Sequence, residues 1–547
     1  MLPTLSHRVS LLARAGSAQP LPLHHRGLQQ HAEACAYAFL TGDADPRLLE
    51  RATECLAALA EQQGDSGLFR TGDNVESPPD SSFTVNGLAR LVRVCRPHRA
   101  TREPAEQALD VLRRSRPGLV TGGVHTPNHR WELAAALAQL ADLLHDDRCG
   151  DRADEWLAEG VDLQDDGLFS ERSPNYAAHV TDPCLLVLAD LRDRADLVDA
   201  VHHNLHAQQL LTDSTGRVET LQSRRQDQTL DHFSIASFAW LHRVIAHRTG
   251  CGQCGSAALR GEELGGSDVL DAVAGALLDP ELLTPPPTRA QTGRTGWTVL
   301  EPSGVAVHRS ESTRLLVRAA PDVARTGRIA SGVAANPTFA HLRVDSPTGD
   351  GPGVWLSSIR LSRAFFGLGP FRGRSLLLGH GRIALHETQA AAYYQPAQVE
   401  LRYEFEGRFA AEMGFDARRQ DLVTLTTEVA VTPRPQGMDL VVETSGAAVP
   451  HAVELGFGRT PFEVAGEAVA LDDERWLVAG PVTLRCEDAV VRIVPEGHEP
   501  EAAWAAYDPG EAYTFLGATD AVGGRRLYVT TRSPGTLRIS VSIEEDR

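Results

Sequence analysis

The sequence predicts a multidomain protein of α and β structure, in which an N-terminal incomplete (α/α) toroid is followed by a C-terminal antiparallel β-sandwich. The chain has 547 residues, more than one hydrophobic core usually serves. Helical periodicity fills the chain from residue 30 to about 280, and short β-rich runs fill the rest. We therefore expect a toroid over residues 1–285 and a sandwich over residues 286–547, divided at the proline-rich segment Thr284–Thr288.

The helical part is predicted from apolar residues that recur every three or four positions. In segment 128–145, Leu133, Leu137, Leu140 and Leu144 fall on one helical face. Segment 194–211 has the same pattern with leucine and valine. Further helical patterns cover residues 47–63, 83–95, 103–114, 183–192 and 232–247.

Glycine-bearing loops recur between these helices and indicate an internal repeat. Asp65–Phe69 (DSGLF) resembles Asp165–Phe169 (DDGLF), Gly122-Gly123 precedes a third loop, and Asp213–Gly216 (DSTG) opens a fourth. These loops start about 50 residues apart, which suits a unit of two helices and two loops. A stack of such hairpins must curve into a solenoid or ring, and its equivalent loops then share one rim.

The C-terminal part alternates short β-rich runs with turns, and no helical pattern lies between them. This arrangement is typical of an antiparallel sandwich. The predicted strands cover residues 314–319, 354–361, 399–405, 422–431, 440–443, 476–478, 490–494, 526–531 and 536–543.

Charge and composition exclude several classes of function. The net charge of −19 argues against a nucleic-acid partner and against binding to an anionic membrane. The chain contains no lysine, so a Schiff-base lysine and a phosphate-loop lysine are both excluded. Every fixed cation is an arginine, a residue suited to gripping carboxylates with two hydrogen bonds.

The cysteines and the N-terminus give weaker signals. Eight scattered cysteines do not form a disulfide framework. Cys251 and Cys254 follow a helix that carries His242 and His247, but no second pair has zinc-finger spacing, so we expect an ordinary loop. Residues 1–30 have no continuous apolar core, and no apolar run is long enough to span a membrane. We expect a cytoplasmic protein without a signal peptide.

Residue types suited to catalysis gather in the four loops of the predicted rim. Each has a plain structural explanation when taken alone: Asn128 as a helix cap, Glu132 as a complement to the helix dipole, Tyr176 as a packed loop residue and the Arg224–Arg225 pair as a solvated face. Their recurrence at the same place in successive repeats favours a shared site. The loops contain Ser77–Asp80, Asn128–Glu132, Glu171–Tyr176 with His179, and Arg224–Asp227.

The pattern Asn-His-x-x-Glu at 128–132, followed by a loop tyrosine at 176, resembles the heparinase II/III-like polysaccharide lyases and the related alginate lyases. In that family a helical toroid precedes a β-sandwich. The resemblance implies that Asn128 neutralises a uronate carboxylate and that His129 is a base or a carboxylate partner. It also implies that Tyr176 is the acid, or both acid and base, and that Glu132 supports His129.

Further residues complete the predicted site. The sandwich of such lyases usually adds a histidine, for which His341 is the first candidate, before His380 and His386. A tyrosine that acts as a base needs positive charge nearby, because its ordinary pKa is about 10. An arginine could supply that charge, and donors must also face the enolate-like intermediate of β-elimination. The predicted substrate-binding residues besides Asn128 and Glu132 are Asp80, Arg130, Arg172, Arg224 and Arg225.

The function expected from the resemblance is a carbon–oxygen lyase that cleaves a uronate-containing poly- or oligosaccharide, or a glycoside, by β-elimination. Two alternatives are a toroidal glycoside hydrolase with paired carboxylates and a uronate epimerase, and a third is a glycan-binding protein without activity. No cofactor is expected, although some heparinase-like proteins carry a divalent metal in the sandwich. The expected partner is an acidic carbohydrate, and the sequence leaves a homo-oligomer open.

Overall fold

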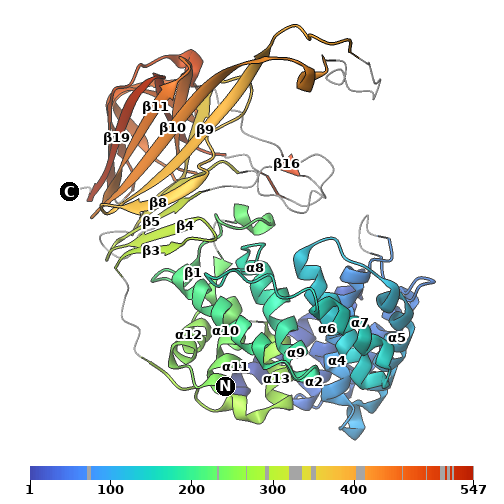
Figure 1. The fold of residues 1–547 in the computed structure, drawn as a ribbon. Coiled ribbons are helices and arrows are strands. Elements are labelled where there is room, and N and C mark those ends of the chain that lie inside the picture. The colour runs from blue at the N-terminus through green and yellow to red at the C-terminus, as the bar shows by residue number, and fades with distance from the viewer. Residues whose placement is uncertain are drawn as a thin grey trace. The chain divides into compact units, whose positions relative to one another are not determined.

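The computed structural model contains helices in its N-terminal half and a large sheet in its C-terminal half (Figure 1). It describes residues 1–70, 75–230, 233–266, 268–289, 295–319, 336–345, 353–401, 413–458, 460–487, 489–505, 512–513, 518–519 and 523–545. The chain divides into two compact units, Met1–Thr292 and Gly293–Arg547. The sequence placed the boundary at residues 285 and 286, which also lie between the last helical turn and the first strand of the sheet.

Helices that follow one another in the first unit pack together, among them α2 on α3, α4 on α5 and α6 on α7. The last helix, α13, packs against α1, α2 and α4, so the end of this unit meets its beginning. The helices are α1 (Leu2–Ser17), α2 (His25–Leu40), α3 (Pro46–Glu61), α4 (Pro78–Cys95), α5 (Arg102–Thr121), α6 (Pro127–Leu144), α7 (Asp147–Leu157), α8 (Pro174–Tyr176), α9 (Asp182–Leu191), α10 (Ala195–Leu210), α11 (Ala239–Thr249), α12 (Gly252–Glu263) and α13 (Val269–Leu278).

Burial separates two rows of helices in this unit. In α6, every residue from Trp131 to Leu140 is buried, as expected for a helix surrounded by protein. In α3, only one face is buried, made of Leu48, Ala52, Cys55, Leu56 and Leu59. Contacts agree with this division, because α2, α4, α6 and α9 touch in succession while α3, α5 and α7 form a second succession.

The loop repeat predicted from the sequence is present at three of its four positions. The three matching loops are residues 64–68, 164–168 and 213–217. In each, the backbone N–H of the first residue donates to the carbonyl oxygen of the fifth at 2.8–2.9 Å. The backbone N–H of the fourth residue donates to the carbonyl oxygen of the first. This fourth residue is a glycine with positive φ in every case: 79° at Gly67, 86° at Gly167 and 90° at Gly216. The predicted third loop differs, because Gly122 caps α5 and has a negative φ of −73°.

The second unit is built on one 15-stranded sheet in which described neighbours are antiparallel except the parallel pair β14–β18. The order is β3-β4-β5-β6-β7-β12-β18-β14-β15-β19-β11-β10-β9-β8, with β13 paired to β14. The strands are β3 (Gly296–Leu300), β4 (Val305–Arg309), β5 (Thr313–Arg318), β6 (Ala340–Val344), β7 (Val354–Arg363), β8 (Ser375–Gly379), β9 (Arg382–Tyr394), β10 (Gln420–Arg434), β11 (Gly437–Gly446), β12 (Pro450–Gly456), β13 (Glu463–Ala470), β14 (Arg475–Arg485), β15 (Ala489–Glu496), β18 (Arg526–Arg532) and β19 (Gly535–Glu545).

One large apolar cluster joins many of the strands, and a smaller one is formed by Ala452, Leu477, Ala505 and Tyr528. Val317 of β5 and Ile383 of β9, from distant parts of the strand order, belong to the same buried cluster. Alternate residues of β9 and β10 are buried, as a strand with one covered face requires. The strand predicted at 399–405 lies largely outside the described residues, and 399–401 are not in a strand. No described helix is long and apolar enough to cross a membrane.

Candidate active site

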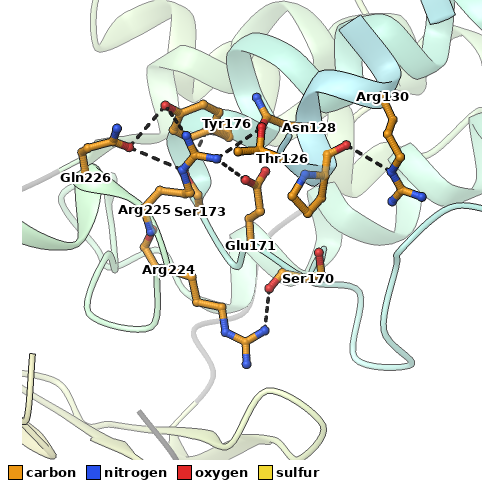
Figure 2. A network of polar contacts seen from close by, with 12 residues as sticks. Thr126, Asn128, Arg130, Ser170, Glu171, Ser173, Tyr176, Arg224, Arg225 and Gln226 are labelled. Carbon is orange, nitrogen blue, oxygen red and sulfur yellow. Dashed lines mark hydrogen bonds and ion pairs between the residues drawn. The ribbon is translucent and has the colours of Figure 1, made fainter. Parts of the chain in front are cut away.

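A buried guanidinium, that of Arg225, joins residues from three of the predicted rim loops (Figure 2). Its Nη1 donates to Oδ1 of Asn128 at 3.3 Å and to the carboxylate of Glu171. Its Nη2 donates to the hydroxyl of Tyr176 at 3.0 Å, and its carbon lies 4.1 Å from the centre of that ring. Three segments separated by about 50 residues each therefore meet at one side chain, as the repeat predicts.

The loop that carries Arg225 is held by a buried carboxylate. Asp227 accepts hydrogen bonds from Ser223 Oγ at 2.5 Å and from Ser173 Oγ at 2.8 Å. It also accepts from the backbone N–H of Asn175 at 3.2 Å. Ser173 in turn caps α8 by accepting from the N–H of Tyr176 at 3.0 Å. Asp227 thus fixes the Tyr176 loop to the Arg225 loop.

Asn128 lies in the first turn of α6 and is almost fully buried. Its Oδ1 accepts from Thr126 Oγ1 at 2.8 Å and from Arg225, which fixes the orientation of the amide. Its Nδ2 is buried and has no hydrogen-bond partner among the described residues. The cap position of α6 belongs to Thr126, so capping does not explain Asn128. A buried donor without a protein partner can bond an acceptor of a ligand.

His129 follows Asn128 on α6, and its Nδ1 is also buried without a described partner. Burial lowers the pKa of His129 to about 3, with smaller contributions from His125, Arg225 and Arg26. Its ring meets the ring of His125 edge to face, with centroids 4.7 Å apart. At neutral pH the imidazole is therefore uncharged and can accept a proton.

Tyr176 is partly exposed, and its hydroxyl donates to Oε1 of Gln226 at 3.3 Å while accepting from Arg225. Burial raises the pKa of Tyr176, against a lowering by Arg225, and Glu171 raises it further. An arginine does stand beside the tyrosine, as expected. Its charge is outweighed, however, so Tyr176 stays protonated at neutral pH and is a proton donor.

Glu171 is the main partner in the network that was not among the predicted site residues, although its loop, Glu171–Tyr176, was singled out. Its carboxylate pairs with Arg225 and accepts from the backbone N–H of Asn128. Burial nevertheless raises its pKa. Gln226 was likewise not singled out. Glu171 and Arg225 are 54 positions apart, so no local pattern in the sequence pairs them.

The other predicted arginines have structural partners. Arg224 donates from Nη1 to the carbonyl of Ser170 at 2.8 Å, which holds the Glu171 loop (Figure 2). Arg130 pairs with Glu159 at 2.9 Å and with Asp162 at 3.0 Å. Arg172 is buried at φ 52°. Arg130, Arg172, Arg224 and Arg225 were the candidates for the positive charge near Tyr176, and Arg225 contacts that residue.

Two predicted acidic residues also have partners of their own. Glu132 is buried, and its carboxylate accepts from Nδ2 of Asn86 at 2.7 Å and from the thiol of Cys184 at 3.2 Å. These bonds connect α6 to α4 and α9, and the expected support of His129 by Glu132 stays a prediction. Asp80 forms an ion pair with Arg26.

The predicted histidines of the second unit lie on its sheet. His341 is on β6 in register with Leu316, and it is mostly buried. His386 is on β9, and His380 occupies the turn before it at φ 51°. The role of His341 in catalysis stays a prediction. The group of possible metal ligands found among the described residues lies in the helical unit rather than in this sheet.

No known protein-family model matches the sequence, and neither does a curated protein. Solved structures with a similar fold include a heparinase III, with a TM-score of 0.56 and 14% identity over 95% of this chain and 76% of that chain. A heparinase III with methylated lysines has a TM-score of 0.50 and 10% identity, over 95% of this chain and 77% of the other. A xanthan lyase from Paenibacillus has a TM-score of 0.50 and 10% identity, over 100% of this chain and 56% of the other.

The predicted resemblance to heparinase-like polysaccharide lyases is confirmed at the level of the fold. At identities of 10–14%, the comparison concerns the path of the chain and carries no residue roles. The chemistry of this protein has to be argued from its own side chains.

Proposed function

We propose that this protein is a lyase that cleaves an acidic, uronate-containing poly- or oligosaccharide by β-elimination at the Arg225 network. The observation that carries the proposal is a pair of buried polar atoms, on adjacent residues of α6, that have no described hydrogen-bond partner. Asn128 Nδ2 is a buried donor, and His129 Nδ1 is a buried ring nitrogen that can accept a proton when the imidazole carries its own proton on Nε2; the described residues bond neither atom. A lyase needs such a donor for the substrate carboxylate and such an acceptor for the proton beside it.

The first step removes the proton from the carbon next to the carboxylate. In the proposed mechanism this C–H bond breaks and its proton moves to His129, which is uncharged in the free protein. A pKa of about 3 makes a weak base, but a bound carboxylate raises the pKa of a neighbouring imidazole. Binding of the acidic substrate would therefore activate the base that attacks it.

The electron pair from the C–H bond moves onto the carboxylate and gives an enolate-like dianion. Asn128 Nδ2 is proposed to donate to one of its oxygens. The amide cannot easily turn away, because Thr126 and Arg225 both hold its Oδ1. A donor that is oriented before the reaction stabilises developing charge without reorganisation, and one such donor is typically worth about 10²–10³ in kcat.

The second step forms the carbon–carbon double bond and breaks the glycosidic C–O bond. Tyr176 is proposed to donate its hydroxyl proton to the departing oxygen. Burial keeps this hydroxyl protonated, and Arg225 holds its position. Arg225 also stabilises the phenolate that remains, since the guanidinium already contacts the phenol oxygen.

The finer architecture expected from the sequence belongs to the same proposal. An incomplete (α/α) toroid is supported by the two successions of helices and by the contacts of α13 with α1, α2 and α4. A sandwich is supported by the large apolar cluster that distant strands share. The heparinase III fold, similar over 95% of this chain, is consistent with both.

The carboxylates at the site argue against the hydrolase alternative. A hydrolase needs two carboxyl groups that face the scissile bond. Glu171 is instead paired with Arg225, Asp227 with two serine hydroxyls, and Asp80 with Arg26. An epimerase would share the first proton transfer without the elimination.

The test is a screen of heparan, chondroitin, alginate and xanthan substrates for the ultraviolet absorbance of an unsaturated uronate. Tyr176→Phe and His129→Ala are each expected to lose at least about a hundredfold in kcat while staying folded. Tyr393→Phe and His203→Ala, on the surface of other elements, are the matched controls. Cleavage without the absorbance would show a hydrolase, deuterium uptake without cleavage an epimerase, and full activity of both site variants would refute the site.

A further inference from the structure

Two histidines and two cysteines from distant segments converge in the helical unit, away from the Arg225 loops. His202 and His206 lie one turn apart on α10, which places their side chains on one face. Cys251 is the cap residue of α12, and Cys254 is in its first turn. The cysteine pair was expected to form an ordinary loop, and His242 and His247 were its nearest sequence candidates. The structure brings a different histidine pair to it.

We propose that His202, His206, Cys251 and Cys254 form a structural zinc site. One ligand atom from each residue lies within 4.8 Å of all the others. The Sγ of Cys251 is 3.4 Å from Nε2 of His206. A tetrahedron with zinc–sulfur bonds of about 2.3 Å and zinc–nitrogen bonds of about 2.0 Å has edges of about 3.3–3.8 Å, so modest closure completes the site.

The surroundings of the four residues favour a ligand. Nε2 of His202 is buried and has no described hydrogen-bond partner, which is costly unless something fills the position. The rings of His202 and His206 meet edge to face with centroids 4.5 Å apart, and both therefore reach the same place. Gln209 of α10 contacts His242 of α11 at 3.4 Å and Gln253 of α12 at 2.7 Å, so hydrogen bonds already join α10 to the helix that carries the cysteines.

The ligand set identifies the metal and its role. Two thiolates and two imidazoles in a tetrahedron select zinc over magnesium or calcium, which prefer oxygen. Four protein ligands leave no open position for substrate, which is the mark of a structural site rather than a catalytic one. The ion would connect α10 to α12. The ligands nearest in sequence on these two helices, His206 and Cys251, are 45 residues apart.

The experiment is metal analysis of the full chain purified from medium that contains zinc. We expect about one zinc per chain after dialysis against buffer without chelator. His202→Gln and Cys254→Ser should each lose most of it, whereas His203→Gln, an exposed neighbour on the same helix, should keep it. Cobalt substitution gives a second readout, because thiolate-bound tetrahedral Co²⁺ has a strong characteristic spectrum that the ligand variants should lack.

A stability measurement guards against variants that merely misfold. Stripping the wild-type protein with a chelator should lower Tm by at least about 5 °C, and added zinc should restore it. Chelator should leave Tm of the folded ligand variants unchanged. Wild type without zinc, retention of zinc by both ligand variants, or a Cys251–Cys254 disulfide in the freshly purified protein would each overturn the proposal.

Discussion

A single side chain, Arg225, holds the candidate site together. It is 4% exposed and contacts Asn128, Glu171, Tyr176 and Gln226. The sequence left Arg130, Arg172, Arg224 and Arg225 as possible partners of Tyr176, and no local signal separates them, least of all the adjacent Arg224 and Arg225. The choice depends on which guanidinium turns towards Glu171, a contact made across 54 positions.

Replacing Arg225 separates its role in stability from its role in catalysis. Arg225→Met leaves the buried Glu171 carboxylate unpaired, and this should lower the free energy of unfolding by about 3–5 kcal/mol. Adding Glu171→Gln removes the unpaired charge and should restore most of that loss. Activity should stay at least about a hundredfold down in both variants, because Tyr176 and Asn128 lose their support. Urea denaturation and the lyase assay measure the two effects, and recovery of activity in the double variant would contradict the role.

The pH dependence of kcat/KM tests the assignment of base and acid. A base is lost as pH falls through its pKa, and burial lowers that of free His129 to about 3. An acid is lost as pH rises through its pKa, and burial raises that of Tyr176 above its ordinary value of about 10. We expect kcat/KM to be nearly flat from about pH 5 to about pH 9. A fall of kcat/KM below about pH 6.5 that disappears in His129→Ala would contradict this prediction, because it would mean that His129 titrates like a solvated imidazole.

At the scale of elements, the repeated loops could be predicted because their glycine is required locally. In each of the three matching loops the glycine adopts positive φ, a conformation that L-residues with a side chain disfavour. The zinc ligands could not be predicted, since a CxxC motif does not indicate which helix packs beside it. The predicted strands also missed β3, β4, β6, β8, β9, β12 and β13. Most residues of β8 and β13 are exposed and most of β12 is buried, so these strands lack the alternation that reveals a half-buried strand.

The loop at Gly167 offers a measurable test of the repeat. A Cβ at Gly167 would lie 2.7 Å from the backbone oxygen of His203 and would sit at φ 86°. Gly167→Ala should therefore lower the free energy of unfolding by about 2 kcal/mol or more. Gly160 has a similar φ of 80°, but a Cβ at this position would have no atom within 4 Å. Gly160→Ala therefore measures the backbone strain alone, and it should lower the free energy of unfolding by about 1 kcal/mol. Equal effects in urea denaturation would mean that the close packing of this loop on α10 is unimportant.

Glu132 tests how α6 is joined to its neighbours α4 and α9. Burial raises its pKa from 4.5 to about 7. The pKa of Glu132 is thus higher in the folded protein than in the unfolded chain. Its contribution to stability is therefore fully present below pH 4.5 and is lost as pH rises through about 7. Glu132→Gln should therefore match wild type in acid and be more stable by about 3 kcal/mol above pH 8. Denaturation curves at pH 4.5 and 8.5 measure this, and a difference that does not depend on pH would contradict the buried carboxyl.

At the scale of the whole molecule, the two-part fold could be predicted because periodicity changes once, from helical to alternating, along the chain. The strand order could not be predicted. Neighbours such as β7 and β12, or β14 and β18, are joined by long stretches of chain, and their register is fixed by pairing rather than by local sequence. The catalytic role expected for His341 stays a prediction for the same reason, since it depends on contacts that no local pattern encodes.

The net charge of −19 predicts how the proposed activity responds to salt. At about 10 mM ionic strength the Debye length is roughly 30 Å, so the whole chain repels an acidic polysaccharide, whereas at about 100 mM it is roughly 10 Å. We expect kcat/KM to rise several-fold over this range through faster encounter, because the buried Arg225 network is screened much less than the surface. The matched comparison is a short glycoside of the same uronate, which carries fewer charges and should show a smaller rise. A steady fall of kcat/KM with added salt would mean that a positive surface attracts the acidic substrate, and that local charge outweighs the net charge of the protein.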